Sequence, residues 1–421
     1  MPDSTYKTYP YRWVELAVFM AINLTIQMLW ICFAPITGPA ARYYGVSDLQ
    51  IGFLAMLFMI VYVPLSIPIA WAIDTIGYRK SVSLGAILMG VFGILRGIFA
   101  ADYPLVVATT LGIAVAQPFM LNAVSTVAAK WFPIQERATA SGLALVASFI
   151  GIAIGQVFAP LLLNQFGIPI MLLTFGLIAA VSSVLFLIFT REAPPTPPCP
   201  EGQETRALML NGLKAMLKMR DVWFLLVIFL FGMGVFNGVT TWIEDIVRPK
   251  GFSPTQAGDF GGILLIGGII GAIVIPALSD KFRMRKIFLI VGMAFAIPGM
   301  LGITFFSNYA LLAAAMFIMG FFLMSVAPIG YQYAAEITYP APEGTSNGLL
   351  NLAGQVSVVF IYAMEAFKGA DGSFTNSLLI LSGLMVVNVF LIIGLKESTL
   401  ISAQITTTNL PVEAENVHLS E

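Results

Sequence analysis

Charged side chains are scarce in this chain, which contains 21 Lys and Arg and 22 Asp and Glu among its 421 residues. They make up 10% of the sequence, whereas charged residues make up roughly a quarter of a soluble domain. The acidic and basic side chains nearly balance, which argues against a basic surface for nucleic acid. Because 58% of the residues are hydrophobic, the composition predicts a protein that lies within a lipid bilayer.

Histidine and cysteine are also nearly absent. The only histidine, His418, lies in a polar C-terminal segment, and the two cysteines are Cys32 in an apolar run and Cys199 in a proline-rich segment. Two such positions provide no framework of paired cysteines. The sequence also lacks clustered histidines and paired acidic residues in the middle of its apolar runs, so we expect no metal site, no cofactor and no enzymatic activity.

Long apolar runs fill most of the chain. A membrane-spanning helix needs about 20 apolar residues, and polar residues divide this sequence into twelve such runs. The runs begin near Trp13, Ile51, Ser81, Pro104, Ala138, Pro169, Val222, Gln256, Ile287, Tyr309, Thr345 and Ser377. The first run is too long for a cleavable signal peptide, so we expect it to remain as a helix. The pattern predicts an all-α membrane protein with twelve transmembrane helices.

A polar, proline-rich segment separates the sixth run from the seventh. It reads REAPPTPPCPEGQETRALMLNGLKAMLKMR, and its second half has basic residues at helical spacing. This linker divides the chain into two halves of six helices each. We expect a first bundle at 1–190, a cytoplasmic linker at 191–220, a second bundle at 221–398 and a cytoplasmic tail at 399–421.

Lysine and arginine are distributed unevenly about the predicted helices. If the N-terminus is cytoplasmic, 16 of the 21 basic residues lie on the cytoplasmic side. The other five, at the outer ends and loops, are Arg42, Arg96, Arg248, Lys250 and Lys368. Cytoplasmic loops of membrane proteins carry such an excess of basic residues. We therefore predict a multi-pass protein of the plasma membrane with both termini in the cytoplasm.

Two pairs of loops indicate that the halves are a diverged repeat. After run two the sequence reads WAIDTIGYRKS, and after run eight it reads PALSDKFRMRKI, so an acid precedes two bases at equivalent places. The residues are Asp74, Arg79 and Lys80 in the first loop and Asp280, Arg285 and Lys286 in the second. A second pair, WFPIQERATASGL after run four and TYPAPEGTSNGL after run ten, repeats an aromatic–proline step, a glutamate and Gly-Leu. The two halves are thus predicted to be pseudo-symmetric.

The charged loops after runs two and eight have two interpretations. An acid at the end of one helix and bases at the start of the next can bridge to a neighbouring helix, and an exposed ion pair contributes only about 1 kcal/mol or less. Such a pair could hold one conformation and break in another, as a latch. Alternatively, the charges only anchor the loops on one side of the membrane. Because the pattern recurs in both halves, we favour the latch.

Acidic residues near the ends of the apolar runs are a second group of candidates. They are Glu15, Glu244, Asp245 and Glu365. Glu244 and Glu365 are expected toward the outer ends of helices seven and eleven, where they could attract a cation or carry a coupling proton or sodium ion. The alternative is an ion pair at the outer surface with Arg248 or Lys368. Near the inner end of helix ten, Tyr331 and Gln332 are candidates for a gate.

The chain resembles the major facilitator superfamily over residues 11 to about 395. That family carries a Gly-x-x-x-Asp-x-x-Gly-x-Arg-Lys motif after helices two and eight. The matching residues are Asp74, Gly77, Arg79 and Lys80 in the first copy and Asp280, Arg285 and Lys286 in the second. Ala70 stands at the first glycine of the first copy, and Arg283 replaces the second glycine of the second copy. The resemblance implies two six-helix bundles that rock about a central site near the membrane midplane.

Several segments resemble a narrower family, the feline leukaemia virus subgroup C receptor-related proteins. They are YRW at 11–13, RYYGVS at 42–47, AVAQPF at 114–119 and, most specifically, EITYPAPEGTSNGLLNLAGQ at 336–355. Those transporters are associated with choline, ethanolamine and haem, and a related branch with pyridoxine. The resemblance implies a secondary transporter that moves a small organic solute, such as an organic cation, by alternating access.

The same resemblance implies a set of substrate-binding residues. The family site uses a tryptophan in helix one, a glutamine in helix four, an aromatic residue in helix seven and a glutamine in helix eleven. The corresponding positions here are Trp30, Gln117 and Gln355, and Asn237 stands where the family has tyrosine in helix seven. The substitution at Asn237 weakens the expected aromatic cage.

The expected depth of the two glutamines and the tryptophan in the membrane also indicates a role for them, independently of the resemblance. At a rise of about 1.5 Å per residue, Gln117 and Gln355 both fall near the bilayer middle, where amides need partners. Hydrogen bonds between helices are the alternative role for such amides. Trp30 lies deeper than the usual aromatic belt and could hold a quaternary ammonium by a cation–π attraction of about 0.5–2 kcal/mol. Its alternative roles are packing or anchoring at the interface.

Other functions for a protein of this type remain open from the sequence. A proton-coupled exporter of drugs or metabolites is one alternative, although Gly151 and Gly155 in GIAIGQVFAP lack the fuller glycine–proline pattern of antiporters. A nutrient sensor of the same fold that does not transport is another, since its ligand site would look the same. We expect a monomer whose partners are a small-molecule substrate and the lipid bilayer.

Overall fold

The structure is a computed structural model that describes residues 7–198, 216–338 and 343–397. Its helices are α1 (Tyr11–Ile31), α2 (Thr37–Tyr44), α3 (Asp48–Ile76), α4 (Tyr78–Ile98), α5 (Tyr103–Leu121), α6 (Val124–Trp131), α7 (Ile134–Phe189), α9 (Arg220–Thr241), α10 (Ile243–Val247), α11 (Pro254–Phe282), α12 (Arg285–Phe305), α13 (Tyr309–Thr338), α14 (Glu343–Val356), α15 (Val358–Ala366) and α16 (Thr375–Ile393). Two 3₁₀ turns, η1 (Ala34–Ile36) and η2 (Arg248–Lys250), complete the described elements. Most of the predicted linker, including Cys199, and the predicted tail lie outside the described residues.

The predicted all-α membrane fold is confirmed. In the described residues, eleven helical segments are long and apolar enough to cross a membrane. One of them, Thr139–Phe189, has 51 residues and is interrupted at Gly167, where φ is 80° and ψ is 173°. A single crossing takes about 20 residues, so this segment has the length of two crossings. It contains the predicted helices five and six.

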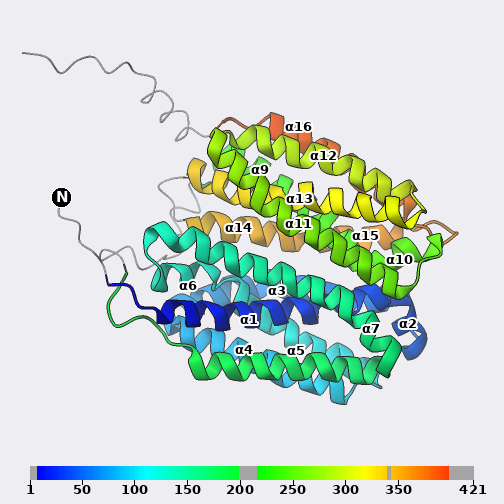
Figure 1. Ribbon diagram of the computed structural model, residues 1–421, viewed down its shortest axis with the longest axis horizontal. Coiled ribbons are helices and arrows are strands. Elements are labelled where there is room, and N and C mark those ends of the chain that lie inside the picture. The colour runs from blue at the N-terminus through cyan, green and yellow to red at the C-terminus, as the bar shows by residue number, and fades with distance from the viewer. Residues whose placement is uncertain (1–6, 199–215, 339–342, 398–421) are drawn as a thin grey trace, which may run out of the picture.

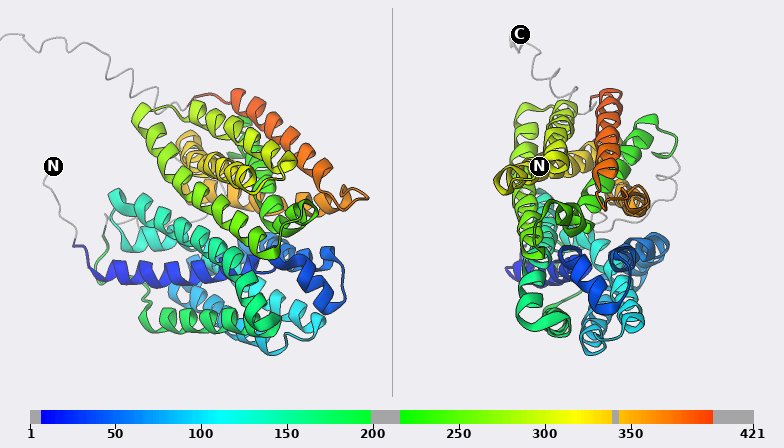
Figure 2. Two further views of the ribbon diagram at one scale, coloured as in Figure 1. Left: turned by 45° about the vertical axis from the view of Figure 1, so that its right-hand side comes forward. Right: turned by 90° about the vertical axis from the view of Figure 1, so that its right-hand side faces the viewer.

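The helices form two groups that lie one above the other (Figure 1). Helices α1–α7 make the lower group and α9–α16 the upper group, and the view along the helices in Figure 2 shows the same division. Two pairs of equivalent helices have equal lengths: α3 and α11 each have 29 residues, and α4 and α12 each have 21. The repeat suggested by the loops therefore extends to the helices.

The starts of α3 and α11 show how the sequence fixes these equivalent helices. Ser47 accepts a hydrogen bond from the Gln50 N–H while the Gln50 side chain accepts one from the Ser47 N–H. Ser253 and Gln256 make the same reciprocal pair at the start of α11. This capping box satisfies two N–H groups that a helix start otherwise leaves without partners. The sequence carries the signal as SDLQ and SPTQ.

Several membrane-spanning helices are broken along their length. α1 stops at Ile31 and resumes as α2 after a 3₁₀ turn, and α14 and α15 are separated at Ser357. α5 and α6 are likewise separated at Asn122 and Ala123. Helix breaks inside a membrane are tolerated where they are buried in protein or line a cavity. Discontinuous helices of this kind commonly surround the substrate site of a transporter.

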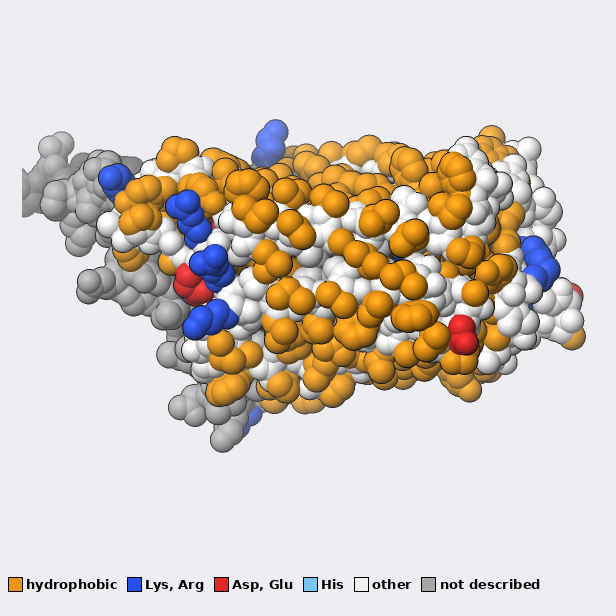
Figure 3. All heavy atoms as spheres, turned by 90° about the horizontal axis from the view of Figure 1, so that it is seen from below, with side chains coloured by type: hydrophobic (Ala, Val, Ile, Leu, Met, Phe, Trp, Pro, Cys, Tyr) orange, Lys and Arg blue, Asp and Glu red, His pale blue; other side chains and the backbone are white. Residues whose placement is uncertain are grey.

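The outer surface agrees with a bilayer environment. Hydrophobic side chains cover the face seen in Figure 3. Over the described surface as a whole, large hydrophobic side chains such as Ile67, Ile188 and Phe390 are more than half exposed. Lysine and arginine gather at one end of this face, and a few charges mark the opposite end (Figure 3). We call the end at which α1 begins the termini face, and the end at which α10 lies the α10 face.

At the termini face, one glutamate holds the start of α4 and another holds the start of α12. Glu192, just beyond the end of α7, accepts hydrogen bonds from the backbone N–H groups of Tyr78 (3.1 Å) and Arg79 (2.7 Å). Glu397, just beyond α16, accepts from the N–H groups of Arg285 (3.0 Å) and Lys286 (3.3 Å). Both carboxylates lie at helix N-termini, where the helix dipole favours negative charge.

Each of the two repeated loops contains a residue with positive φ, although ψ differs between them, at 153° for Gly77 and 41° for Arg283. Gly77 has φ 105° and Arg283, at the equivalent position, has φ 54°. Arg283 is the only non-glycine residue with positive φ in the described residues. Both turns require a positive φ, which glycine adopts freely, and the left-handed conformation of Arg283 costs an L side chain roughly 1–2 kcal/mol. This explains the glycine in the first copy and indicates local strain in the second.

Exchanging side chains at these two positions tests the strain. Arg283→Gly is expected to raise the free energy of unfolding by up to about 1 kcal/mol, since glycine relieves the positive φ at some entropic cost. Gly77→Ala should lower it, because the new Cβ would also lie 3.1 Å from the Glu192 carboxylate. Gly372→Ala, where φ is 77° and nothing lies within 4 Å, isolates the cost of φ alone. Thermal unfolding in detergent measures all three, and an unchanged melting temperature for Arg283→Gly would contradict the strain.

Candidate functional site

A cavity of about 140 Å³ lies between the two groups of helices. Its walls come from α1, α5, α7, α9, α12, α13 and α14, so both halves contribute. The lining residues used below are Gln27, Trp30, Gln117, Phe149, Phe229, Phe236, Asn237, Tyr331, Asn351 and Gln355. The structure thus brings the four predicted substrate-binding residues to one cavity.

Trp30 lies in the last turn of α1, immediately before the helix breaks. Its indole N–H donates a hydrogen bond to the carbonyl of Ala55 on α3, at 3.1 Å. The bond fixes the edge of the ring against α3, and the side chain is buried. An aromatic ring held in this way at a cavity wall can present its face to a cation without losing further side-chain freedom.

Gln117 lies on α5 and is 3% exposed. Its amide nitrogen donates to the side-chain oxygen of Gln27 at 3.0 Å. Its own side-chain oxygen is buried and has no hydrogen-bond partner in the described structure. A buried amide oxygen without a partner costs free energy, so a ligand N–H or O–H donor at this position would be stabilised. Gln27 was not among the residues predicted from the sequence, although it lies one helical turn before Trp30.

Asn237 and Gln355 line the cavity from the second half. The Asn237 amide donates to the Ser357 hydroxyl at 3.2 Å, which joins α9 to the break between α14 and α15. Asn237 is buried, whereas Gln355 on α14 is partly exposed. The asparagine therefore has a structural contact of its own as well as a place in the cavity wall.

Aromatic side chains other than the expected helix-seven tyrosine surround the cavity. Phe229 and Phe236 on α9, Phe149 on α7 and Tyr331 on α13 all belong to its lining. The rings of Phe229 and Tyr331 lie 5.0 Å apart, and the Tyr331 hydroxyl donates to Asn351. No Asp, Glu, Lys or Arg is among the described lining residues. The cavity is a neutral, aromatic-rich site with several amide groups.

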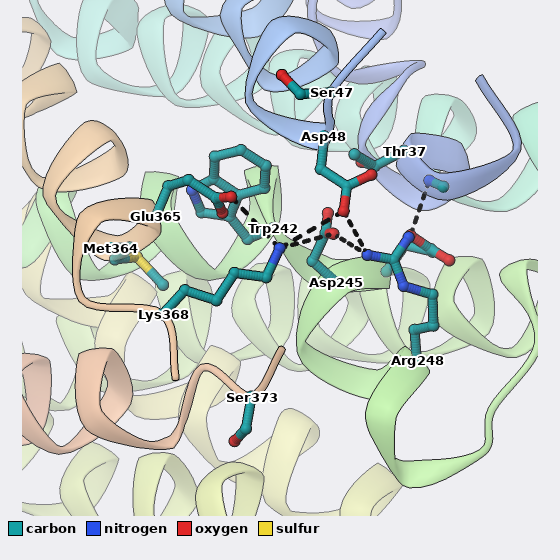
Figure 4. Close-up of polar contacts among 12 residues, drawn as sticks. Thr37, Ser47, Asp48, Trp242, Asp245, Arg248, Met364, Glu365, Lys368 and Ser373 are labelled. Carbon is teal, nitrogen blue, oxygen red and sulfur yellow. Dashed lines mark hydrogen bonds and ion pairs between the residues drawn. The ribbon is translucent and has the colours of Figure 1, made fainter. Parts of the chain in front are cut away.

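A second polar site closes the α10 face between the halves (Figure 4). Asp48 at the start of α3 in the first half accepts from Arg248 Nη2 at 2.6 Å and lies 3.5 Å from Lys368 Nζ. The backbone N–H of Gly38 donates to Glu244 Oε2 at 3.0 Å. Arg248, Lys368 and Glu244 belong to the second half. We call this set of crossing contacts the α10-face cluster.

Within the cluster, Glu244 pairs with Arg248 and Glu365 pairs with Lys368. The sequence offered these ion pairs as the alternative to a role in ion coupling. Glu244 Oε2 lies 3.2 Å from Arg248 Nη1, and Glu365 Oε1 lies 3.4 Å from Lys368 Nζ. Glu244 is nearly fully buried, so this is not a surface pair. Burial raises the pKa of Glu244, and Arg248 opposes that rise. The crossing partner Asp48 was not singled out from the sequence.

Packing reinforces the closure at the α10 face. Trp242, which follows α9, is fully buried, and a Cβ on Gly52 of α3 would lie 2.4 Å from its ring. The Gln156 amide on α7 donates to the Thr240 carbonyl on α9 at 2.9 Å. Asn164 on α7 donates to the Thr255 hydroxyl on α11 at 2.9 Å. The halves are in direct contact at this end of the molecule.

At the termini face, neither aspartate of the repeated loops forms an ion pair with the other half within the described part of the chain. Asp74 is exposed and makes no ion pair within 4 Å among the described residues. Lys130 instead pairs with Glu192. In the second half, Asp280 pairs with Arg285 of its own loop. The ion pairs recorded for these loops join elements of one half.

The other basic residues of the repeated motif differ in their surroundings. Arg285 also lies 3.1 Å from Glu336 at the end of α13 and is buried. Arg79, Lys80 and Lys286 are present at the helix starts, where the backbone of Arg79 and Lys286 is held by Glu192 and Glu397. Neither glutamate was predicted from the sequence, although each follows the last helix of its half.

Comparison with known proteins agrees with this architecture. Residues 19–406 match the family model described as Major Facilitator Superfamily. The chain is 30% identical over 376 residues to the choline/ethanolamine transporter FLVCR2 of Homo sapiens. The aligned region covers 84% of this chain and 71% of that protein. The chain is also 29% identical over 391 residues to solute carrier family 49 member A3 of Danio rerio, covering 88% and 81% of the two chains.

Solved structures share the fold at lower identity. One is an inward-facing, unoccupied bacterial homolog of the human lysosomal transporter Spinster, with a TM-score of 0.70 and 17% identity over 95% of this chain and 99% of that chain. The occupied inward-facing form of that homolog gives a TM-score of 0.72 with 15% identity and the same coverage. At these identities the likeness concerns the fold alone.

Proposed function

Because this chain belongs to the Major Facilitator Superfamily, it is a membrane transporter, and we propose that its substrate is a small organic cation such as choline or ethanolamine. The observation that carries the proposal is that Trp30, Gln117, Asn237 and Gln355 line one neutral cavity. Relatives that share about 30% identity are named for transport of these two molecules.

The size of the cavity supports a substrate of this class. Benzene fills an engineered apolar cavity of about 150 Å³ and has one fewer non-hydrogen atom than choline. The cavity here, at about 140 Å³, is therefore matched to choline or ethanolamine. A drug-sized cation or haem would require a much larger opening, so the proposal disfavours a drug exporter.

The chemistry of the lining supports a cation that needs no paired carboxylate. Trp30 supplies an aromatic face, and Phe229, Phe236 and Tyr331 supply others in the second half. A quaternary ammonium is bound by such faces through cation–π attraction. The free side-chain oxygen of Gln117 is an acceptor for the substrate hydroxyl, or for an ammonium N–H of ethanolamine.

We propose that transport follows alternating access, with the α10-face cluster as the outer gate. Glu244 and Glu365 act in this gate through Arg248 and Lys368. The loops of the repeated motif lie at the inner gate, where their contacts hold the helices of each half together as that half moves. Their residues are Asp74, Gly77, Arg79, Lys80, Asp280, Arg283, Arg285 and Lys286. The protein functions as a monomer in the plasma membrane, with two six-helix domains and no cofactor or catalytic site.

Ligand binding and transport test the substrate class directly. Purified protein is screened by thermal shift against choline, ethanolamine, pyridoxine, haem and drug-like cations, and is then assayed for counterflow in proteoliposomes. We expect saturable shifts and counterflow with choline or ethanolamine. Betaine is the matched control, since it keeps the quaternary ammonium but carries a carboxylate for which the lining offers no basic partner. Selective binding of haem or of drug-like cations would overturn the proposal, and binding without counterflow would favour a sensor.

Orientation in the membrane has its own test. We propose that the termini face is cytoplasmic, in agreement with the basic residues gathered there (Figure 3). An impermeant thiol reagent added to intact cells should label cysteines introduced at the exposed positions Asp102 and Asp371 of the α10 face. It should not label cysteines at Lys80 or Lys286 until the membrane is permeabilised. Labelling in the reverse order would show the opposite orientation.

A further inference from the structure

The α10-face cluster contains more acidic than basic groups. Its carboxylates come from α3, α10 and α15, and its basic groups come from η2 and from the turn after α15. The acidic members are Asp48, Glu244, Asp245 and Glu365, and the basic members in ion-pair contact with them are Arg248 and Lys368. Arg42 on α2, which is exposed, is a third basic group near Glu244. Two positive charges therefore lie in contact with four potential negative charges.

Asp245 lies between the two basic groups of the cluster. Its side chain is 0% exposed, and its Oδ1 accepts from Arg248 Nη2 at 2.6 Å and lies 3.9 Å from Lys368 Nζ. Its other oxygen, Oδ2, is buried and has no hydrogen-bond partner in the described structure. An ionised carboxylate with one oxygen removed from both water and donors is unfavourable. A protonated carboxyl places its hydroxyl on that oxygen and lowers the excess negative charge of the cluster by one.

Asp48 and Asp245 also share one donor nitrogen. Asp48 Oδ2 and Asp245 Oδ1 both lie 2.6 Å from Arg248 Nη2, and Figure 4 shows the two carboxylates directed at it from opposite halves. Carboxylates held this close compete for ionisation, and such a pair retains a proton more readily than either group alone. The pair exists only while the halves are in contact at this end.

We propose that Asp245 binds a proton when the α10 face is closed and releases it to the outside solution when the face opens. Closing the face buries Asp245 between Arg248 and Lys368, with Asp48, Glu244 and Glu365 as its acidic neighbours. Opening separates Asp48 from Arg248 and exposes Asp245 to water. The proton is thus a ligand of the closed conformation. This site rests on alternating access and does not depend on which substrate the cavity takes.

The direction of the pH effect follows from the two states. Burial, and then the neighbouring Glu244, raise the pKa of Asp245 well above its ordinary value in the closed state, whereas an exposed aspartate titrates near about 3.9. Between these two values the closed state holds one more proton than the open state. Lowering the pH in that window therefore favours closure, by up to about tenfold per pH unit for one proton.

A distance measurement between the halves tests this linkage without substrate. Spin labels are attached to cysteines replacing the exposed loop residues Ala101 and Ser307 in a Cys199→Ser background, and the protein is studied in lipid nanodiscs from about pH 8 to about pH 5. We expect the population with long distances to fall as the pH falls. Asp245→Asn should remove this dependence. Asp371→Asn, which neutralises an exposed acid of the same face outside the cluster, should leave it intact.

Other outcomes would overturn the proposal. A distance distribution in the parent protein that is the same throughout this pH range, or a pH dependence that persists in Asp245→Asn, excludes Asp245 as the proton site. Should Asp245→Asn fail to fold, Glu244→Gln serves instead, and its pH midpoint should move to a lower value because a like charge is removed. A shift that depends on sodium and not on pH would assign the site to a metal ion. Failure of these tests leaves the choline experiments unaffected.

Discussion

Trp30→Ala is expected to weaken binding of a quaternary ammonium substrate by roughly twofold to 30-fold, and Trp30→Phe to weaken it less. Phenylalanine retains an aromatic face for the cation, whereas alanine retains none, and the attraction is worth about 0.5–2 kcal/mol. Isothermal titration or a thermal-shift titration with choline measures both variants. The effect should be larger for choline than for a neutral analogue of the same shape.

The contacts of Trp30 allow the cation contribution to be separated from structural damage. Both substitutions remove the hydrogen bond to the Ala55 carbonyl, so the difference between alanine and phenylalanine reports the aromatic face. Trp13→Ala is the matched control, because Trp13 lies on the same helix but is 46% exposed at the termini face. Equal affinities for the alanine, phenylalanine and parent proteins would show that Trp30 is packing only.

Much of the architecture could be predicted because its determinants are local in the sequence. Apolar runs of membrane length and polar breaks predict the spans, and the repeated loops predict two related halves. The resemblance also led to Trp30, Gln117, Asn237 and Gln355, which the fold brings to one cavity. Gln27 and the phenylalanines of α9 could not be predicted in this way. In the sequence, an apolar or amide residue that lines a cavity has the same helical spacing as one that packs against a neighbouring helix.

The α10-face cluster shows what could not be predicted in this way. Asp48 and Lys368 are 320 residues apart in sequence, and only the packing of the two halves makes them neighbours. Asp48 alone resembles an ordinary acidic residue in the first turn of a helix. The repeated loops are a second example. The sequence pattern pointed to Asp74, whereas the carboxylate that accepts hydrogen bonds from the start of α4 is Glu192, 114 residues from Tyr78 in sequence.

Replacing Arg248 should have the largest effect on the conformational equilibrium. Arg248 is the only described basic residue within 4 Å of Asp48, Glu244 and Asp245 together. Arg248→Gln removes one of the two basic groups that pair with Asp48 across the halves, and leaves Asp48, Glu244 and Asp245 with Lys368 as the remaining basic neighbour. Its ion pairs are partly buried, so their loss should cost the closed α10 face about 2–3 kcal/mol, between the values for exposed and buried pairs. That is a shift of roughly 30-fold to 150-fold toward the conformation open at this face.

The same pair of spin labels, or the rate at which a thiol reagent reaches a cysteine at Asn237, measures this shift. Lys250→Gln is the control, since Lys250 lies in the same turn but donates to the carbonyls of Thr304 (3.0 Å) and Phe306 (2.9 Å) within its own half. Burial lowers the pKa of Lys250 to about 8, so the control is made below that pH, where the parent carries the charge. It should lose thermal stability without opening the face. If Arg248→Gln stays closed, or if Lys250→Gln opens the face equally, the ion pairs of Arg248 do not hold the halves together. The closure then depends on the other crossing contacts, such as Trp242 against Gly52 and the hydrogen bond from Gln156 to Thr240.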